Sequence, residues 1–255
     1  MRPSPRRIPD QRNRPHRPAH KLNRSRITRI STPQERPDHR VIHIDGKPSL
    51  IVPEHILLEL NLQPGLILSA PLEKELESAG ELSKARSRAI RLLTIRLRTQ
   101  EELRRSLIRA DFSHTAIEET IRTLSKDGIL DDRLFAELFA EEKRRVRGYA
   151  PARIESDLRS RGVAREISHG AAWGVYGEGP GDVDSCLLDE GMAVLRRKQI
   201  HYEGLLPQVA RRRMAGLLGR AGYPVSVAID AVNAVIEEME AEGLLSGTEG
   251  ERTDS

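Results

Sequence analysis

The chain has 255 residues, with 42 Lys and Arg against 38 Asp and Glu, a single Cys, and only 3% aromatic residues. One Cys excludes an internal disulfide framework and a Cys-rich zinc site, and no apolar run approaches the roughly 18 residues of a membrane span. Few aromatic residues argue against a β-sandwich and against a stacking surface for single-stranded bases. We therefore expect a soluble, cytoplasmic, largely helical protein.

Positive charge is concentrated at the N-terminus. Residues 1–40 contain twelve Lys or Arg and three Asp or Glu, so the net charge of +4 comes from this segment. It also holds seven of the fifteen Pro and few apolar residues, which predicts a disordered basic tail over 1–39. The tail could bind nucleic acid phosphates or simply aid solubility. It has neither the apolar core of a secretory signal nor the amphipathic helix of a transit peptide.

Residues 40–80 are expected to form a small β-hairpin and helix region. The apolar segments on either side of Asp45-Gly46 predict a hairpin with a type I′ turn, because this dipeptide accepts positive φ. Pro48 restricts the second strand to a sheet edge. Pro53 is expected to open a short helix, and residues 66–69 are a candidate third strand.

Helical sequence follows from Pro71 and has clear boundaries. Thr99 with Glu102 fits a capping box, and Ser113 fits an N-cap with a hydrophobic staple. Pro151 suits the first turn of a helix. Five glycines follow apolar-periodic segments and are expected at left-handed C′ positions: Gly128, Gly148, Gly162, Gly222 and Gly243.

An apolar spacing recurs three times and predicts an internal repeat. Each copy reads as a short amphipathic helix, a turn and a second amphipathic helix. With a preceding helix, the copies give three-helix units at 81–127, 131–182 and 184–242, the second containing a Gly/Pro insert, and residues 243–255 form a disordered C-terminus. We expect the units to stack into an elongated curved array, because each is too small to bury its own faces. The repeated positions are Leu103, Leu107, Phe112, Ile117 and Ile121; Ile154, Leu158, Val163, Ile167 and Ala171; and Met214, Leu218, Tyr223, Ala228 and Val232.

The segment from Gly128 to Val163 contains a long and specific series of residues. It reads Gly-Ile-Leu-Asp-Asp-Arg-Leu-Phe-Ala at 128–136, then Lys-Arg-Arg at 143–145, then a Gly, Ile, Leu and Arg-Gly-Val series ending at Val163. This series resembles the RecX family of recombination regulators. The stretch from Thr99 to Leu107 is similar to the first repeat of the family. The resemblance covers about 84–242, whereas the first 39 residues and residues 173–184 depart from it.

The resemblance implies a function. Members of this family bind the RecA recombinase, lying in the groove of its filament on single-stranded DNA. They mainly inhibit its recombinase, ATPase and coprotease activities, which places them in DNA repair, recombination and control of the SOS response. It follows from the resemblance that this chain is a non-enzymatic regulator, expected to be a monomer, whose partner is the RecA filament and possibly the DNA within it.

Clusters of basic residues recur in the repeats and are the candidate partner-binding residues. Guanidinium groups suit bidentate contacts to carboxylate or phosphate, although solvated helix faces with local ion pairs are an alternative explanation for any single Arg. A nucleic-acid-binding helical module that uses the basic tail as an arm is the alternative function. The candidates are Arg104, Arg105 and Arg109; Lys143, Arg144, Arg145, Arg147, Arg153, Arg159 and Arg161; and Arg196, Arg197, Lys198, Arg211, Arg212 and Arg213.

No chemistry-bearing constellation accompanies these clusters. Asp131 and Asp132 fit helix capping better than metal binding, and the Gly-rich insert lacks the Lys-Ser/Thr of a phosphate loop. Trp173, Tyr176 and Cys186 are expected in the core. We therefore expect no catalytic residue, no metal and no cofactor.

Overall fold

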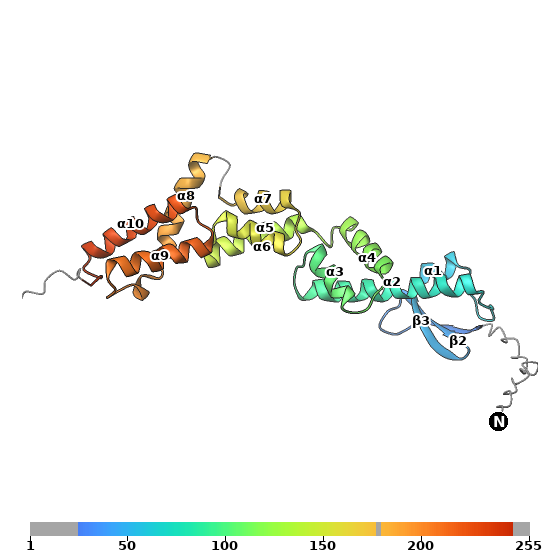
Figure 1. The fold of residues 1–255 in the computed structure, drawn as a ribbon. Helices are drawn as coiled ribbons and strands as arrows, with labels where there is room; N and C mark the ends of the chain where they lie inside the picture. Colours follow the sequence, from blue (N-terminus) through green and yellow to red (C-terminus); the bar gives the residue numbers. More distant parts are fainter. Residues whose placement is uncertain (1–24, 177–179, 247–255) are drawn as a thin grey trace, which may run out of the picture. The chain divides into compact units, whose positions relative to one another are not determined.

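A computed structural model describes residues 25–176 and 180–246, and the chain divides into two compact units after Ser83. The described chain is mainly helical, with one three-stranded antiparallel sheet near its N-terminus (Figure 1). This confirms the mainly α fold class. The expected disorder of residues 1–24 and 247–255 and the start of the Gly/Pro insert lie outside the described residues.

The first unit is built on the sheet. β1 (Ile27–Ser31), β2 (His39–Ile44) and β3 (Lys47–Pro53) lie in the order β1-β2-β3. Asp45 and Gly46 between β2 and β3 have φ of +49° and +82°, which confirms the type I′ turn. Pro48 lies in β3, an edge strand, as expected because proline has no N–H to donate.

β1 corrects the predicted boundary of the basic tail. Residues 25–39 are part of the folded unit, and Ile27 is fully buried, its N–H bonded to the carbonyl of Leu66 at 3.0 Å. Composition did not reveal this strand, because the few apolar residues of β1 are outnumbered by the charged residues and prolines of the 39-residue segment. The candidate third strand at 66–69 is wrong: Ile67 forms only an isolated bridge with Arg26.

Two helices complete the first unit. α1 (Glu54–Glu59) follows Pro53, as expected, and α2 (Ala70–Ile95) continues past Ser83 into the second unit. Leu76 of α2 belongs to the same buried cluster as Ile27, Ile42 and Val52 of the sheet. The unit is thus a sheet covered by helices around one apolar core.

The described residues of the second unit form three successive groups of three α-helices. The group called the first repeat consists of α2 from Lys84, α3 (Gln100–Ile108) and α4 (His114–Lys126). The second repeat contains α5 (Asp132–Glu142), the π-helix η1 (Lys143–Arg147), α6 (Pro151–Ser160) and α7 (Arg165–Gly174). The third repeat contains α8 (Pro180–Arg196), the 3₁₀ turn η2 (Gln199–His201), α9 (Pro207–Ala221) and α10 (Val225–Ala241).

The recurring apolar positions form the cores of these repeats. The middle helix of each repeat contributes two fully buried side chains four residues apart, one helical turn, so both point to one face. They belong to one cluster in the first repeat and to a larger shared cluster in the second and third. The pairs are Leu103 and Leu107 in α3, Ile154 and Leu158 in α6, and Met214 and Leu218 in α9.

Helix boundaries follow the capping signals closely. Thr99, Ser113 and Asp131 are N-caps whose side chains accept backbone N–H bonds, and all five glycines singled out as helix ends have positive φ. The capping box differs in one respect. The carboxylate of Glu102 contacts two arginines instead of turning back to the N–H of Thr99, because both arginines offer charged donors.

Candidate functional site

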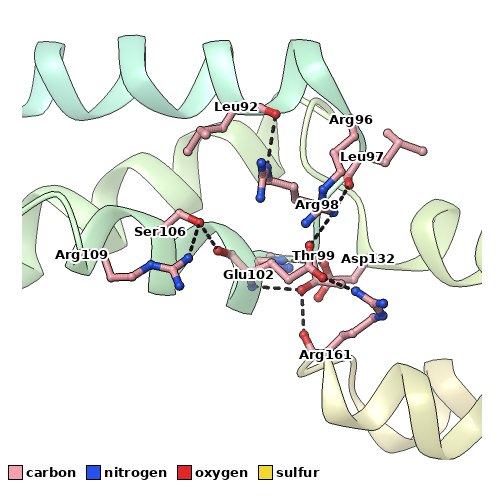
Figure 2. A network of polar contacts seen from close by, with 11 residues as sticks. Leu92, Arg96, Leu97, Arg98, Thr99, Glu102, Ser106, Arg109, Asp132 and Arg161 are labelled. Atoms are coloured by element: carbon pink, nitrogen blue, oxygen red, sulfur yellow. Dashed lines mark hydrogen bonds and ion pairs between the residues drawn. The ribbon is translucent and has the colours of Figure 1, made fainter.

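The first and second repeats meet at the N-terminus of α3 (Figure 2). The buried hydroxyl of Thr99 accepts a hydrogen bond from the N–H of Glu102 at 3.1 Å and donates one to the carbonyl of Arg161 at 2.7 Å. Arg161 is the C-cap of α6. One side chain therefore caps α3 and also satisfies a carbonyl at the end of α6, two groups that helix geometry leaves without partners.

Charged groups add to this contact between two successive repeats, which we call a joint. The Glu102 carboxylate lies 2.5 Å from the guanidinium of Arg161 and 2.8 Å from that of Arg96. Asp132, at the start of α5, accepts a hydrogen bond from the N–H of Gln100 at 2.9 Å. Burial raises the pKa of Asp132 above its usual value, against the lowering effect of this hydrogen bond. The polar groups at this joint thus form most of their hydrogen bonds and ion pairs with one another.

The second and third repeats are joined by a backbone hydrogen bond at equivalent positions. The N–H of Ala150, the N-cap of α6, donates to the carbonyl of Ala221, the last residue of α9, at 2.9 Å. Ala150 follows Thr99 by 51 residues and Ala221 follows Arg161 by 60 residues, the two offsets at which the apolar spacing recurs. The repeat is therefore structural as well as sequential, and its joints use equivalent positions.

Two glycines allow these close approaches. A Cβ on Gly162 would lie 2.3 Å from the Cβ of Glu101, and a Cβ on Gly222 would lie 2.7 Å from the backbone N of Arg153. Both glycines have positive φ. The corresponding position in the first repeat is Asp111, which also has positive φ but is exposed.

The sixteen predicted basic residues fall into two groups. Seven form ion pairs with acidic side chains within the described chain, which favours a structural role for them. They are Arg104 with Glu101 and Glu118, Arg105 with Glu101, Lys143 with Glu142, Arg144 with Glu190, Arg153 with Asp157, Arg161 with Glu102, and Arg196 with Glu238.

Arg104 and Arg144 are the most strongly held of the seven. Arg104 binds Glu118 through two hydrogen bonds of 2.7 and 3.0 Å and Glu101 through a third of 2.9 Å. These bonds lower the pKa of both carboxyls. Fork-like pairing of this kind fixes the guanidinium geometry within the fold.

Arg144 links three elements of the second and third repeats. It lies in the π-helix η1, bonds Glu190 of α8 at 2.6 Å and the carbonyl of Val175, and stacks over the Tyr176 ring with its Cζ 4.6 Å from the centroid. Its side chain is about one third exposed. A partner would have to displace these contacts, so Arg144 is a poor candidate for direct recognition.

The other nine residues form no ion pair with any residue that the structure describes. Some have other bonds, such as Arg211 to Asn233 at 2.6 Å and Arg109 to Ser106 at 3.3 Å. The nine are Arg109, Arg145, Arg147, Arg159, Arg197, Lys198, Arg211, Arg212 and Arg213. Their charge is available to a partner.

Four of these nine gather with other cations around one surface depression. Two adjoining cavities of about 830 and 430 Å³ share Lys198, Leu217 and Arg220 and lie across the junction of the second and third repeats. We call them together the basic groove. No residue that the structure records along either cavity is acidic, and the six cationic side chains are all exposed: Arg147, Arg153, Lys198, Arg212, Arg213 and Arg220.

Sequence reasoning missed Arg220, which joins the two cavities. The signal was present, since Arg213, Gly216 and Arg220 recur at the spacing of one helix face. Gly216 leaves room for the long side chain, because a Cβ there would lie 3.3 Å from Arg220 Nη1. Two other candidates, Arg145 and Arg197, lie instead in a depression that also contains acidic side chains.

Neither a metal-binding group of side chains nor a membrane-spanning helix occurs in the part of the chain that the structure describes. It contains no group of three or more His, Cys, Asp or Glu placed to hold a metal ion. Across residues 25–176 and 180–246, no helix is long and apolar enough to cross a membrane. The Asp131 side chain caps α5 by accepting the N–H groups of Arg133 and Leu134, as its sequence position predicts.

These features define a helical-repeat protein whose three-helix modules are joined end to end. Two family models match it: RecX, first three-helix domain, over residues 85–124, and RecX, second three-helix domain, over residues 131–169. A crystal structure of a regulatory protein RecX shares the fold, with a TM-score of 0.62 over 84% of this chain and 99% of that chain, at 20% identity.

Curated relatives are more similar to the chain in sequence than this crystal structure is. Regulatory protein RecX of Amycolatopsis mediterranei (strain U-32) is 32% identical over 172 residues, which cover 67% of this chain and 94% of the relative. Regulatory protein RecX of Thermobifida fusca (strain YX) is 32% identical over 162 residues, covering 64% and 82%. The chain belongs to the RecX family of regulatory proteins.

Proposed function

We propose that this protein is a cytoplasmic, monomeric regulator that binds the RecA recombinase filament and mainly inhibits its recombinase, ATPase and coprotease activities. It would act in DNA repair and recombination and in control of the SOS response, without catalysing a reaction itself. The observation that carries the proposal is the match to a regulatory protein RecX over 94% of that relative's length.

The repeat architecture supports a filament as the partner. A filament presents the same surface on successive protomers, and this chain presents related modules joined by equivalent bonds at Thr99 and Ala150. Once one module is bound, the next binds at a high effective concentration, so weak contacts combine into strong overall binding. Nine cations without an ion pair among the described residues provide charge for such contacts.

The experiment is ATP hydrolysis by RecA on single-stranded DNA with increasing amounts of the full chain. We expect strong inhibition at fewer than one molecule per recombinase protomer, because blocking one filament position affects its neighbours. A single-stranded-DNA-dependent helicase that forms no filament is the control. No effect on RecA at large excess, or equal inhibition of both enzymes, would overturn the proposal, and the second result would indicate competition for DNA.

A further inference from the structure

The basic groove has a chemical character that restricts what can occupy it. Its charged side chains are all cations, so they act only as hydrogen-bond donors. A peptide strand brings a backbone N–H with every residue except proline, and each N–H needs an acceptor when it is covered. A phosphodiester chain brings acceptor oxygens and one negative charge per nucleotide. The groove matches the second ligand better.

We propose that the basic groove binds the sugar-phosphate backbone of a single-stranded nucleic acid across the joint between the second and third repeats. Arg147 contributes from the second repeat, and Lys198, Arg212, Arg213 and Arg220 from the third. Arg153 also lines the groove, but its guanidinium is paired with Asp157 at 3.2 Å. The inference deepens the proposed function by naming a direct nucleic acid contact, and it can be tested in the absence of any recombinase.

The groove favours binding without base recognition. Of its aromatic rings, Tyr149 lies under the Arg153 guanidinium, 5.7 Å from the ring centroid, Tyr202 is buried, and the His201 imidazole is exposed. One exposed imidazole is not a row of aromatic faces on which successive bases could stack, which is how single-strand-binding surfaces gain sequence-tolerant affinity from bases. Binding therefore depends on phosphate contacts and should fall steeply with salt.

Occupation of the groove would also hold the two repeats together. Its cations come from both sides of the joint at which the Ala150 N–H bonds the Ala221 carbonyl and Gly222 packs on the backbone of Arg153. A backbone bound to both sets of cations opposes separation of the two repeats. We expect slower hydrogen exchange of the Ala150 amide when nucleic acid is bound.

The test measures binding of fluorescein-labelled oligothymidylate to the full chain by anisotropy over a range of salt concentrations. The groove variant carries Arg212→Glu and Arg213→Glu. The matched control carries Arg133→Glu and Arg165→Glu, which change the net charge equally at exposed positions that do not line the groove. We expect the groove variant to bind about ten-fold more weakly than the control. Its salt slope should be smaller by about 1.4, or about 0.7 per lost phosphate contact.

The outcomes separate this inference from the proposed function. Equal binding by the groove variant and the control overturns the inference and leaves the proposed RecA regulation intact. A polyglutamate peptide is tested as well. If it binds the wild-type chain as tightly as oligothymidylate does, and the groove variant weakens both equally, the inference is overturned in favour of an acidic protein segment as the ligand. Unchanged exchange of the Ala150 amide on binding contradicts the placement across the joint. Circular dichroism checks that both variants are folded.

Discussion

The Thr99 hydroxyl and the Arg161 carbonyl, 62 residues apart in the chain, lie within 2.7 Å of each other. This bond makes a helix N-cap part of the contact between two repeats. The same relationship, with a backbone N–H in place of the hydroxyl, recurs between Ala150 and Ala221. The stability of the second unit should therefore be sensitive to single residues at these helix ends.

Thr99→Ala is expected to lower the free energy of unfolding by about 1–2 kcal/mol, since it removes an N-cap and leaves a covered carbonyl without its donor. Thr99→Ser keeps the hydroxyl and should recover most of the loss. Urea denaturation of the full chain followed by circular dichroism measures both. A Thr99→Ala variant as stable as the wild type would show that the joint contributes nothing to stability.

Gly222→Ala is expected to be much more destabilising than Gly128→Ala. Both positions have positive φ, which costs an L-residue about 1–2 kcal/mol. Only at Gly222 would the new Cβ meet a backbone, at 2.7 Å from the N of Arg153, whereas the space around Gly128 is open. Forcing the backbones apart should add about 1–3 kcal/mol. Equal thermal midpoints for the two variants would refute a tight joint at Gly222.

Substitutions of two adjacent arginines in η1 should have different effects on the free energy of unfolding. Arg144→Met is expected to cost about 1–3 kcal/mol, because it leaves Glu190 and the Val175 carbonyl without their donor. Arg145→Met, at an exposed position with no ion pair among the described residues, should stay within about 0.5 kcal/mol of the wild type. Denaturant midpoints decide the matter, and equal losses for the two variants would rule out a linking role specific to Arg144.

Asp132 should give the joint a characteristic pH dependence. Burial raises its pKa above the ordinary 3.8, so the unfolded chain ionises this group at lower pH than the folded chain does. Folding stability from this group therefore falls as pH rises from 3.8 through the raised pKa. Asp132→Asn cannot ionise and still offers an oxygen to the Gln100 N–H.

The measurement is the difference in unfolding free energy between Asp132→Asn and the wild type across this range. The difference should move in favour of the Asn variant as pH rises, and should level off once Asp132 is ionised in both states. A difference that is independent of pH, or one that moves toward the wild type, would contradict a raised pKa at Asp132.

Local signals predicted the helical part of the fold well, because capping and turn chemistry act within a few residues. Ser113 and Asp131 cap helices where expected, and the 51- and 60-residue offsets reappear as equivalent hydrogen bonds between helix ends. β1 was missed because Ile27 lies among arginines, and its burial depends on the contact with Leu66, far along the chain.

The surface was harder to predict than the core. A cluster in the sequence makes every Lys or Arg an equal candidate for binding. In the fold, Glu118 pairs with Arg104 and Glu190 pairs with Arg144, so these two arginines are engaged within the chain. The fold also brings Arg147 from one repeat beside Lys198 of the next, through tertiary packing that no local pattern encodes. The sequence clusters did include five of the six groove cations, and the helical spacing from Arg213 to Arg220 could have added the sixth.

Asp111, two residues beyond the C-cap of α3, has a consequence for the addition of further repeats. Gly162 and Gly222 each receive the start of a preceding helix, but the equivalent residue of the first repeat is Asp111, whose side chain would obstruct such an approach. A tandem duplication that inserted another module ahead of the first would therefore need this aspartate replaced by glycine.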